Sequence, residues 1–335
     1  MINTVLAVEQ VRRMRGGTQS HLMRCSDGEY YVVKFQNNPQ GARILANEML
    51  GSALASRLGL PTPEIAIVDV RNRLIELTED LVVQFGRGRY PCSPGLCFGS
   101  RYPSKGNPLG GRTMLEVWDF LPRDHMSRVT NLVDFAGMLV FDKWTCNTDG
   151  RQVVFVRVTP QNFNVVMIDN GFCFNAAEWN FPDAPLRALY PLPYTYEAVL
   201  GIHTFEPWLQ LLETKIDKQW LAEVAEEIPR EWYAQATNTL AALLDKLERR
   251  RTLVRELLRS ACASSPGHFP NWAGRRGLIH FDSGKIESEP LEAGAAGAAL
   301  PDPQDSAPAG FNFRAATAGS AAPVVLGRRG ATEIV

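Results

Sequence analysis

The sequence lacks the features that would place a protein in a membrane or hold it together with disulfides. No apolar run approaches the roughly 20 residues that a membrane-spanning helix needs. The first residues, MINTVLAVEQVRRMRGG, contain no apolar segment long enough for a signal peptide. Six cysteines form no Cys-x-x-Cys pair and no zinc-ligand spacing. We therefore expect a cytoplasmic protein with free thiols and no membrane partner.

A basic excess is missing as well. The 35 Lys and Arg residues are balanced by 36 Asp and Glu residues, which leaves a formal net charge of −1. Proteins that bind nucleic acid usually carry a basic excess, so we expect no direct nucleic-acid binding. With 335 residues, 45% of them hydrophobic, the chain can form two domains, or one domain of two lobes, around a substantial core.

The first third of the chain has mostly strand patterns. A Ser26-Asp27-Gly28 turn signal separates two short runs rich in β-branched and aromatic residues, which predicts a hairpin. A following stretch repeats its apolar residues at helical spacing. The expected elements are strands at 22–24, 30–35, 65–70 and 73–77, a helix at 40–57, and a Gly- and Pro-rich connection at 90–111 with one short strand near 96–102.

The rest of the chain has mainly helical patterns and ends in a low-complexity tail. Helices are expected at 132–144, 208–212 and 220–228, and a single long helix at 234–260. In the long helix, Glu248-Arg249-Arg250-Arg251 is interpreted as a solvated face. From 293 onward Ala, Gly, Pro and Ser dominate, which predicts disorder. The residues expected on the buried side of the long helix are Leu240, Leu243, Leu244, Leu247, Leu253, Val254 and Leu257.

Three N-terminal features indicate phosphate binding. Gly16 and Gly17, in Arg15-Gly16-Gly17-Thr18-Gln19-Ser20, let backbone N–H groups approach a phosphate. Lys34 lies inside an apolar strand, where its ammonium group needs a partner or a ligand. Glu48, on the following helix, can be that partner, as in kinases, where such a pair holds the Lys against ATP phosphates. Taken singly, each feature is better explained by an ordinary structure: a Gly-Gly turn, a lysine at a sheet edge and a glutamate on an exposed helix face.

Two acidic segments complete the pattern. Asp149 follows an apolar helix in Asn147-Thr148-Asp149-Gly150, and Asp169 follows an apolar strand in Ile168-Asp169-Asn170-Gly171. The residues between them predict a hairpin of strands 153–158 and 164–168, which would bring both carboxylates to one end. One carboxylate could accept the proton of an attacking hydroxyl while the other holds Mg²⁺ on the phosphates. The alternative is two independent turn aspartates.

In this order, these elements resemble the HipA-like kinase family. The resemblance covers roughly residues 5–272 and includes Phe181-Pro182-Asp183 and Phe269-Pro270-Asn271-Trp272. It implies an α+β, bilobal protein-kinase-like fold with ATP and Mg²⁺ between the lobes. The implied N-terminal lobe, at 1–103, binds nucleotide and is rich in strands, with one helix. A mainly α-helical catalytic lobe follows at 104–275, and a disordered tail at 276–335.

The resemblance also implies roles for individual residues. Asp149 would be the catalytic base, supported by Lys34 and Glu48, and Asp169 would bind the metal. The family usually places an Asn five residues after the catalytic Asp, where this chain has Val154. The carbonyl oxygen of Gln152 could substitute for it as a metal ligand. The residues that would bind ATP are Gly16, Gly17, Thr18, Gln19 and Lys34.

The implied activity is ATP-dependent phosphorylation of a Ser or Thr hydroxyl of a protein. Two alternatives stay open: a pseudokinase that binds nucleotide or a partner without turnover, which Val154 favours, and a kinase for a small-molecule hydroxyl. The distinguishing features lie in residues 175–196, whose pattern does not decide among them. HipA-type toxins often pair with a small DNA-binding protein, but nothing in this sequence shows an interface for such an antitoxin-like partner.

Overall fold

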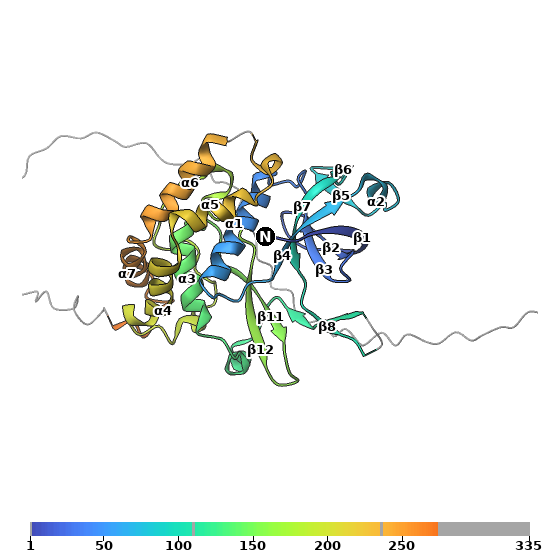
Figure 1. The fold of residues 1–335 in the computed structure, drawn as a ribbon. Coiled ribbons are helices and arrows are strands. Elements are labelled where there is room, and N and C mark those ends of the chain that lie inside the picture. Colours follow the sequence, from blue (N-terminus) through green and yellow to red (C-terminus); the bar gives the residue numbers. More distant parts are fainter. Residues whose placement is uncertain (1, 109–110, 235–236, 274–335) are drawn as a thin grey trace, which may run out of the picture. The chain divides into compact units, whose positions relative to one another are not determined.

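The computed structural model describes residues 2–108, 111–234 and 237–273, all within one compact unit (Figure 1). The predicted disordered tail, 276–335, lies outside the described residues. No described helix combines the length and the apolar character that crossing a bilayer requires. All six cysteines are free and buried, which confirms the expectation of unpaired thiols.

A closed five-stranded barrel forms the N-terminal part. In spatial order it contains β1 (Thr4–Arg13), β2 (His21–Cys25), β3 (Tyr30–Lys34), β7 (Gly95–Arg101) and β4 (Ile65–Val70). Neighbouring strands are antiparallel except β1 and β4, which close the barrel as a parallel pair. The predicted hairpin and the strand at 65–70 are confirmed. The expected short strand near 96–102 is β7, a central strand that pairs with both β3 and β4.

Shorter elements surround the barrel. The strand predicted at 73–77 is wrong: these residues belong largely to a short helix, α2 (Asn72–Glu76), whose Ile75 is buried, so this part contains two helices rather than one. Five residues are too few for their periodicity to distinguish a helix from a strand. The accompanying hairpins are β5 (Val82–Phe85) with β6 (Gly88–Pro91), and β8 (Ser104–Gly106) with β9 (Arg112–Met114).

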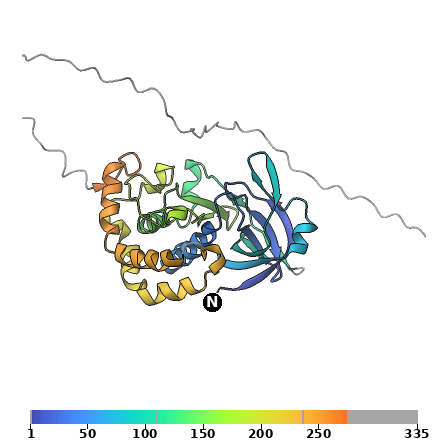
Figure 2. The same cartoon turned by 90° about the horizontal axis from the view of Figure 1, so that it is seen from above.

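Helix α1 (Arg43–Arg57) lies between the barrel and the C-terminal helices in both views (Figures 1 and 2). It begins three residues later than predicted, and eleven of its fifteen residues are buried. Its buried polar residues, Asn47, Glu48 and Ser52, are unusual for a helix packed on two sides, because burying a polar group is costly unless it finds a partner. All three contribute to the site described below.

The C-terminal part is built around α3 (Asp134–Thr145), which is almost entirely buried. The single long helix predicted at 234–260 is wrong, because the chain breaks after α6 (Thr237–Arg250) and resumes as α7 (Val254–Ser264). Leu253, expected to be buried, lies at this break and is 53% exposed. The other helices are α4 (Glu206–Lys215), α5 (Lys218–Glu226) and the short 3-10 helices Arg123–Arg128, Ala176–Glu178, Pro193–Tyr196, Ile202–Phe205 and Arg230–Trp232.

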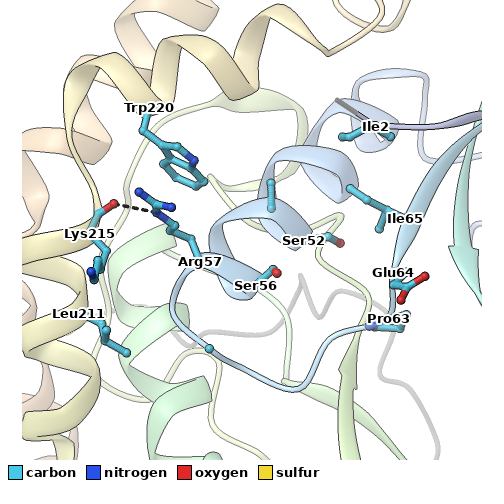
Figure 3. Close-up of a pocket in the computed structure, with 12 residues that line it drawn as sticks. Ile2, Ser52, Ser56, Arg57, Pro63, Glu64, Ile65, Leu211, Lys215 and Trp220 are labelled. Carbon is cyan, nitrogen blue, oxygen red and sulfur yellow. Dashed lines mark hydrogen bonds between the residues drawn. The ribbon is translucent and has the colours of Figure 1, made fainter.

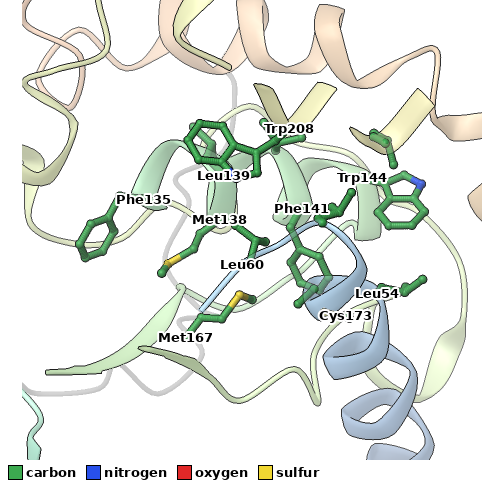
Figure 4. Packing of buried hydrophobic residues seen from close by; sticks show 14 of the residues in the cluster. Leu54, Leu60, Phe135, Met138, Leu139, Phe141, Trp144, Met167, Cys173 and Trp208 are labelled. Carbon is green, nitrogen blue, oxygen red and sulfur yellow. The ribbon is translucent and has the colours of Figure 1, made fainter. Parts of the chain in front are cut away.

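One apolar cluster joins these helices to α1 and to a small sheet (Figure 4). The sheet has the order β10 (Val117–Trp118), β11 (Gln152–Arg157), β12 (Phe163–Ile168), and its β11–β12 hairpin confirms the prediction. Gln152 pairs with Ile168, so the segments that carry Asp149 and Asp169 meet at the same end of the hairpin. Members of the cluster drawn in Figure 4 include Leu54, Leu60, Phe135, Met138, Phe141, Trp144, Met167 and Trp208.

Candidate active site

Lys34 makes two ion pairs at the centre of the site. The inward side chains of β3 fill the barrel, so Lys34 points outward, toward α1. Its Nζ atom donates to Glu48 Oε1 and, at 3.0 Å, to Asp169 Oδ1. The Lys34 side chain is only 8% exposed and that of Glu48 3%, whereas 26% of the Asp169 side chain is exposed. The structure therefore brings together three of the residues singled out from the sequence.

These charges shift one another's pKa values. Burial alone would lower the pKa of Lys34, but the carboxylates of Asp169 and Glu48 raise it above its usual value. Burial likewise opposes ionisation of Asp169, yet the Lys34 ammonium group lowers the Asp169 pKa to about 2. Burial raises the pKa of the more deeply enclosed Glu48. Of the two carboxylates, Asp169 is thus both the more firmly ionised and the more accessible to a ligand.

The turn that carries Asp169 packs tightly on α1. Asp169 has φ of +60°, a left-handed conformation that is uncommon for a non-glycine residue and is often found at functional sites. The backbone N–H of Asn170 donates to Glu48 Oε2 at 3.0 Å, and its side-chain amide donates to Ser52 Oγ at 3.2 Å. Gly51 allows this approach, because a Cβ atom there would lie 2.7 Å from Asn170 Cβ.

We expect Gly51→Ala to destabilise the fold although alanine is the better helix former. The added methyl group must push Asn170 away from α1, and overpacking of this kind costs roughly 1–3 kcal/mol. The free energy of unfolding, from urea denaturation, measures the loss. Gly106→Ala is the matched control, because a Cβ atom at Gly106 would meet nothing within 4 Å. Equal stability of the two variants would contradict the close packing of Asn170 on α1.

A buried ion pair connects the two acidic segments. Arg151 Nε donates to Asp142 Oδ2 at 2.9 Å, and the two side chains are 1% and 0% exposed. Arg151 Nη1 donates to the carbonyl oxygen of Ile168 at 2.8 Å and to Asn170 Oδ1 at 3.2 Å. Asp142 Oδ1 also accepts from Asn147 Nδ2 at 3.0 Å. Arg151 and Asp142 therefore hold the Asn147 and Asp169 loops against each other.

Asp149 lies at the open side of this network. It is exposed, and its backbone N–H donates to Asn147 Oδ1 at 3.1 Å. Because Asn147 in turn donates to Asp142, this hydrogen bond ties the Asp149 loop to α3. Gly150 N donates to Asp149 Oδ1 at 2.8 Å, and Gln152 Nε2 donates to Asp149 Oδ2 at 3.4 Å. In the described part of the chain, no hydrogen bond or ion pair joins Asp149 directly to Lys34 or Asp169. The register of the hairpin nevertheless brings Asp149 to the same end as Asp169, which with Lys34 and Glu48 forms the ion-paired triad of the site.

The glycine-rich loop is placed by different contacts. Gly17 faces the segment before α1, where a Cβ atom would lie 2.8 Å from Gln40 Nε2. Thr18 is buried, and Gln19, with φ of +51°, donates through Nε2 to the Gln84 carbonyl oxygen at 2.8 Å. Among the described residues, the side chains of this loop make no hydrogen bond to the triad. Gln19 is occupied by the β5–β6 hairpin.

The segment after Asp169 is held by α1. Asn47 Nδ2 lies within hydrogen-bond distance of the carbonyl oxygens of Gly171, Cys173 and Ala176, at 2.7, 3.2 and 2.8 Å. Asn47 Oδ1 accepts from Trp179 Nε1 at 2.7 Å. One buried amide of α1 thus fixes both the turn beside Asp169 and the residues that follow it.

Helices α3 and α6 hold a later part of the same segment, at residues 183–187. Lys143 Nζ donates to the carbonyl oxygens of Pro185 and Arg187 at 2.8 and 2.7 Å, and burial lowers the Lys143 pKa to about 8. Arg250 donates to Asp183 Oδ1 and Oδ2 at 2.6 and 2.7 Å. The prediction that Arg250 belongs to a solvated face is wrong, since it is 7% exposed.

The Arg250–Asp183 ion pair therefore anchors this segment to α6. The Arg250 guanidinium group also lies 4.4 Å from the ring centroid of Phe181. Sequence reasoning identified Phe181 and Asp183 as part of a resemblance but gave them no physical role. Asp142, Lys143 and Arg250 were missed. For Asp142 and Lys143 a signal existed, because charged residues inside an apolar helix need buried partners, which is the argument that pointed to Lys34.

Comparison with known proteins identifies a family for this chain. The family model described as HipA-like kinase matches residues 7–178. No curated protein sequence matches the chain. Among solved structures, the proinflammatory kinase CtkA of Helicobacter pylori has a TM-score of 0.48 and 14% identity, over 79% of this chain and 99% of that chain.

Two other solved structures are similar at comparable levels. Hydra Fam20 with sugar has a TM-score of 0.45 and 12% identity, over 78% of this chain and 86% of that chain. The toxin–antitoxin complex of HipA, HipB and operator DNA from Shewanella oneidensis has a TM-score of 0.40 and 14% identity, over 75% and 68%. Likenesses at these scores do not establish a shared substrate or partner.

Proposed function

This chain belongs to the HipA-like kinase family, and we propose that it is an ATP-dependent phosphotransferase that acts on a Ser or Thr hydroxyl of a protein. The observation that carries the proposal is the triad of Lys34, Glu48 and Asp169. A buried lysine held between a helix glutamate and a partly exposed aspartate is the arrangement that positions nucleotide phosphates and their metal in kinases.

The nucleotide would lie beside this triad. Lys34 would contact the phosphates while Glu48 holds its ammonium group in place. Val32 of β3, and Val154 and Ile168 of the hairpin, are partly exposed apolar residues on the strands that carry or precede the triad residues. Such a surface suits the base of a nucleotide, because ligand sites combine apolar walls with a few polar groups.

Mg²⁺ suits the donors that are present. Asp169 and Gln152 supply oxygen ligands, which Mg²⁺ prefers. No group of three or more His, Cys, Asp or Glu side chains within the described ranges could hold a metal alone. This agrees with an ion bound through one or two protein ligands together with substrate phosphates. Mg²⁺ held by Asp169 and Gln152 would neutralise charge on the phosphates.

Asp149 would orient the acceptor hydroxyl and accept its proton. Its exposure and its position at the hairpin end support this role. The register also bears on the pseudokinase alternative, because Gln152 pairs with Ile168, directly before Asp169, whereas Val154 pairs with Val166. Gln152 is therefore the strand residue closer in register to the proposed metal ligand, which favours turnover despite Val154.

We expect ATP with Mg²⁺ to stabilise the protein against thermal unfolding. At 100-fold excess over the dissociation constant, binding adds about 2.7 kcal/mol to the free energy of unfolding. Lys34→Met removes a phosphate contact but keeps most of the side-chain volume, so it should lose most of this shift. Differential scanning fluorimetry with and without ATP and Mg²⁺ measures the effect.

Lys105→Met, at an exposed lysine of β8, is the matched control and should keep the full shift. An unchanged ATP shift in Lys34→Met would remove the basis of the proposal. If Lys34→Met does not fold, Asp169→Asn tests the same site, because it is expected to weaken binding of the nucleotide only when Mg²⁺ is present.

A further inference from the structure

A cavity opens beside the C-terminal half of α1. It has a volume of about 660 Å³, and none of Lys34, Glu48, Asp149 or Asp169 lines it (Figure 3). Its walls come from the C-terminal half of α1, the start of β4 and the helices α4 and α5. Sites for small molecules occupy roughly 300–1,000 Å³ and are lined mainly by apolar side chains. Ile2, Ile65 and Leu211 supply such a lining here.

Positive charge predominates in the lining of this pocket. Arg57 Nε donates to the Lys215 carbonyl oxygen at 2.9 Å, and its guanidinium group lies 5.0 Å from the ring centroid of Trp220 (Figure 3). Within the described residues, neither Arg57 nor Lys215 forms an ion pair with a carboxylate. The acidic residue of the lining, Glu64, is paired with Arg101. Among the described residues, the lining therefore includes two cationic side chains without a carboxylate partner, beside an apolar wall.

The pocket is connected to the candidate active site through Ser52. This buried residue lines the pocket, and its Oγ atom accepts the hydrogen bond from Asn170 Nδ2 at 3.2 Å. The backbone N–H of Asn170 donates in turn to Glu48 Oε2. A ligand that moves Ser52 must therefore disturb the turn that carries Asp169.

We propose that this pocket binds a small anionic amphiphile, an apolar chain or ring that ends in a carboxylate. The carboxylate pairs with Arg57 and Lys215, and the apolar part lies against Ile65 and Leu211. Occupancy changes the affinity of the active site for nucleotide through Ser52 and Asn170. This coupling rests on the proposed function, whereas binding in the pocket does not.

Binding is tested on the full chain with octanoate and 3-phenylpropionate as probes, by isothermal titration calorimetry. Acetate, which lacks the apolar part, and 1-octanol, which lacks the charge, are the matched ligands. We expect saturable binding of the two amphiphilic carboxylates and at least ten-fold weaker binding of acetate and 1-octanol. Absence of saturable binding by both carboxylates would overturn the proposal.

Two variants locate the binding. Arg57→Met removes the charge, and Ser56→Phe fills the pocket from an exposed position of α1. Each should raise the octanoate dissociation constant at least ten-fold, while Arg259→Met, at an exposed arginine of α7, should not. If one variant does not fold, the other decides. Octanoate binding that survives in a folded variant would place the ligand elsewhere and contradict the assignment.

The coupling is measured separately, as the ATP dissociation constant with and without saturating octanoate. We expect a change of at least three-fold, which Ser52→Ala abolishes while octanoate still binds. Octanoate binding that leaves the ATP affinity unchanged would refute the coupling. If the protein binds no ATP at all, the proposed function fails, yet the calorimetry on Arg57→Met still decides whether the pocket binds carboxylates.

Discussion

Replacing Asp149 with Asn should lower phosphoryl transfer by the roughly 10²–10⁴-fold that a positioned base contributes, with little change in ATP affinity. Asp149 is proposed to act on the acceptor hydroxyl, which is not part of the nucleotide. Its carboxylate thus contributes mainly in the transition state, and its loss appears in the transfer rate rather than in nucleotide binding.

Asp169→Asn should behave differently, because Asp169 is proposed to hold Mg²⁺ in the ground state as well. It should weaken Mg²⁺-dependent nucleotide binding and transfer together. Asp124→Asn is the matched control, since the Asp124 side chain is 78% exposed and lies in the 3-10 helix Arg123–Arg128. Transfer that survives Asp149→Asn undiminished would show that Asp149 is only a turn residue.

The second large effect is expected on stability. Asp142→Leu leaves the Arg151 guanidinium group buried without its carboxylate, and breaking a buried ion pair in this way costs roughly 3–5 kcal/mol. The double variant Asp142→Leu/Arg151→Met contains no unpaired buried charge, so it should regain a substantial part of the loss. Urea denaturation of both variants and of the wild type gives the free energies of unfolding.

The exposed pair of Arg123 and Glu197 provides the comparison, with side chains 71% and 46% exposed. Arg123→Met should change the free energy of unfolding by no more than about 1 kcal/mol, as is usual for surface ion pairs. A result for Asp142→Leu as small as that for Arg123→Met would mean that the buried network does not hold the two acidic loops together.

The Lys34–Glu48 pair was predictable, because a buried lysine without a partner is costly and its partner is close in sequence. A lysine in the strand Tyr30–Lys34 needs a partner, and Glu48 on the next helix is within reach of it. The order of the elements also predicted that one hairpin would bring Asp149 and Asp169 to the same end, which the pairing of Gln152 with Ile168 supports.

The supporting residues were not predicted, because their partners lie on other elements of the fold. Arg151 contacts Asp142, and Arg250 reaches Asp183 across 67 residues. No periodicity relates such pairs. The run around Arg250 looked like an ordinary charged helix face, and only the packing of α6 on the segment after Asp169 reveals that one of its arginines is buried.

For a related reason, the central place of one predicted strand was not foreseen, and one long helix was predicted wrongly. Strand β7 lies in a Gly- and Pro-rich stretch, and its place at the centre of the barrel depends on pairing with β3 and β4, which local composition does not encode. The break between α6 and α7 interrupts an apolar pattern that would suit a continuous helix. In both cases tertiary contacts override the local pattern.

Incubation with γ-labelled ATP and Mg²⁺ shows whether this site transfers a phosphoryl group. The wild-type protein should transfer label to itself or to a protein in a lysate, and Asp149→Asn and Asp169→Asn should not. Binding of ATP with no label on any protein would contradict the account and favour a pseudokinase, with Val154→Asn as the variant to examine next.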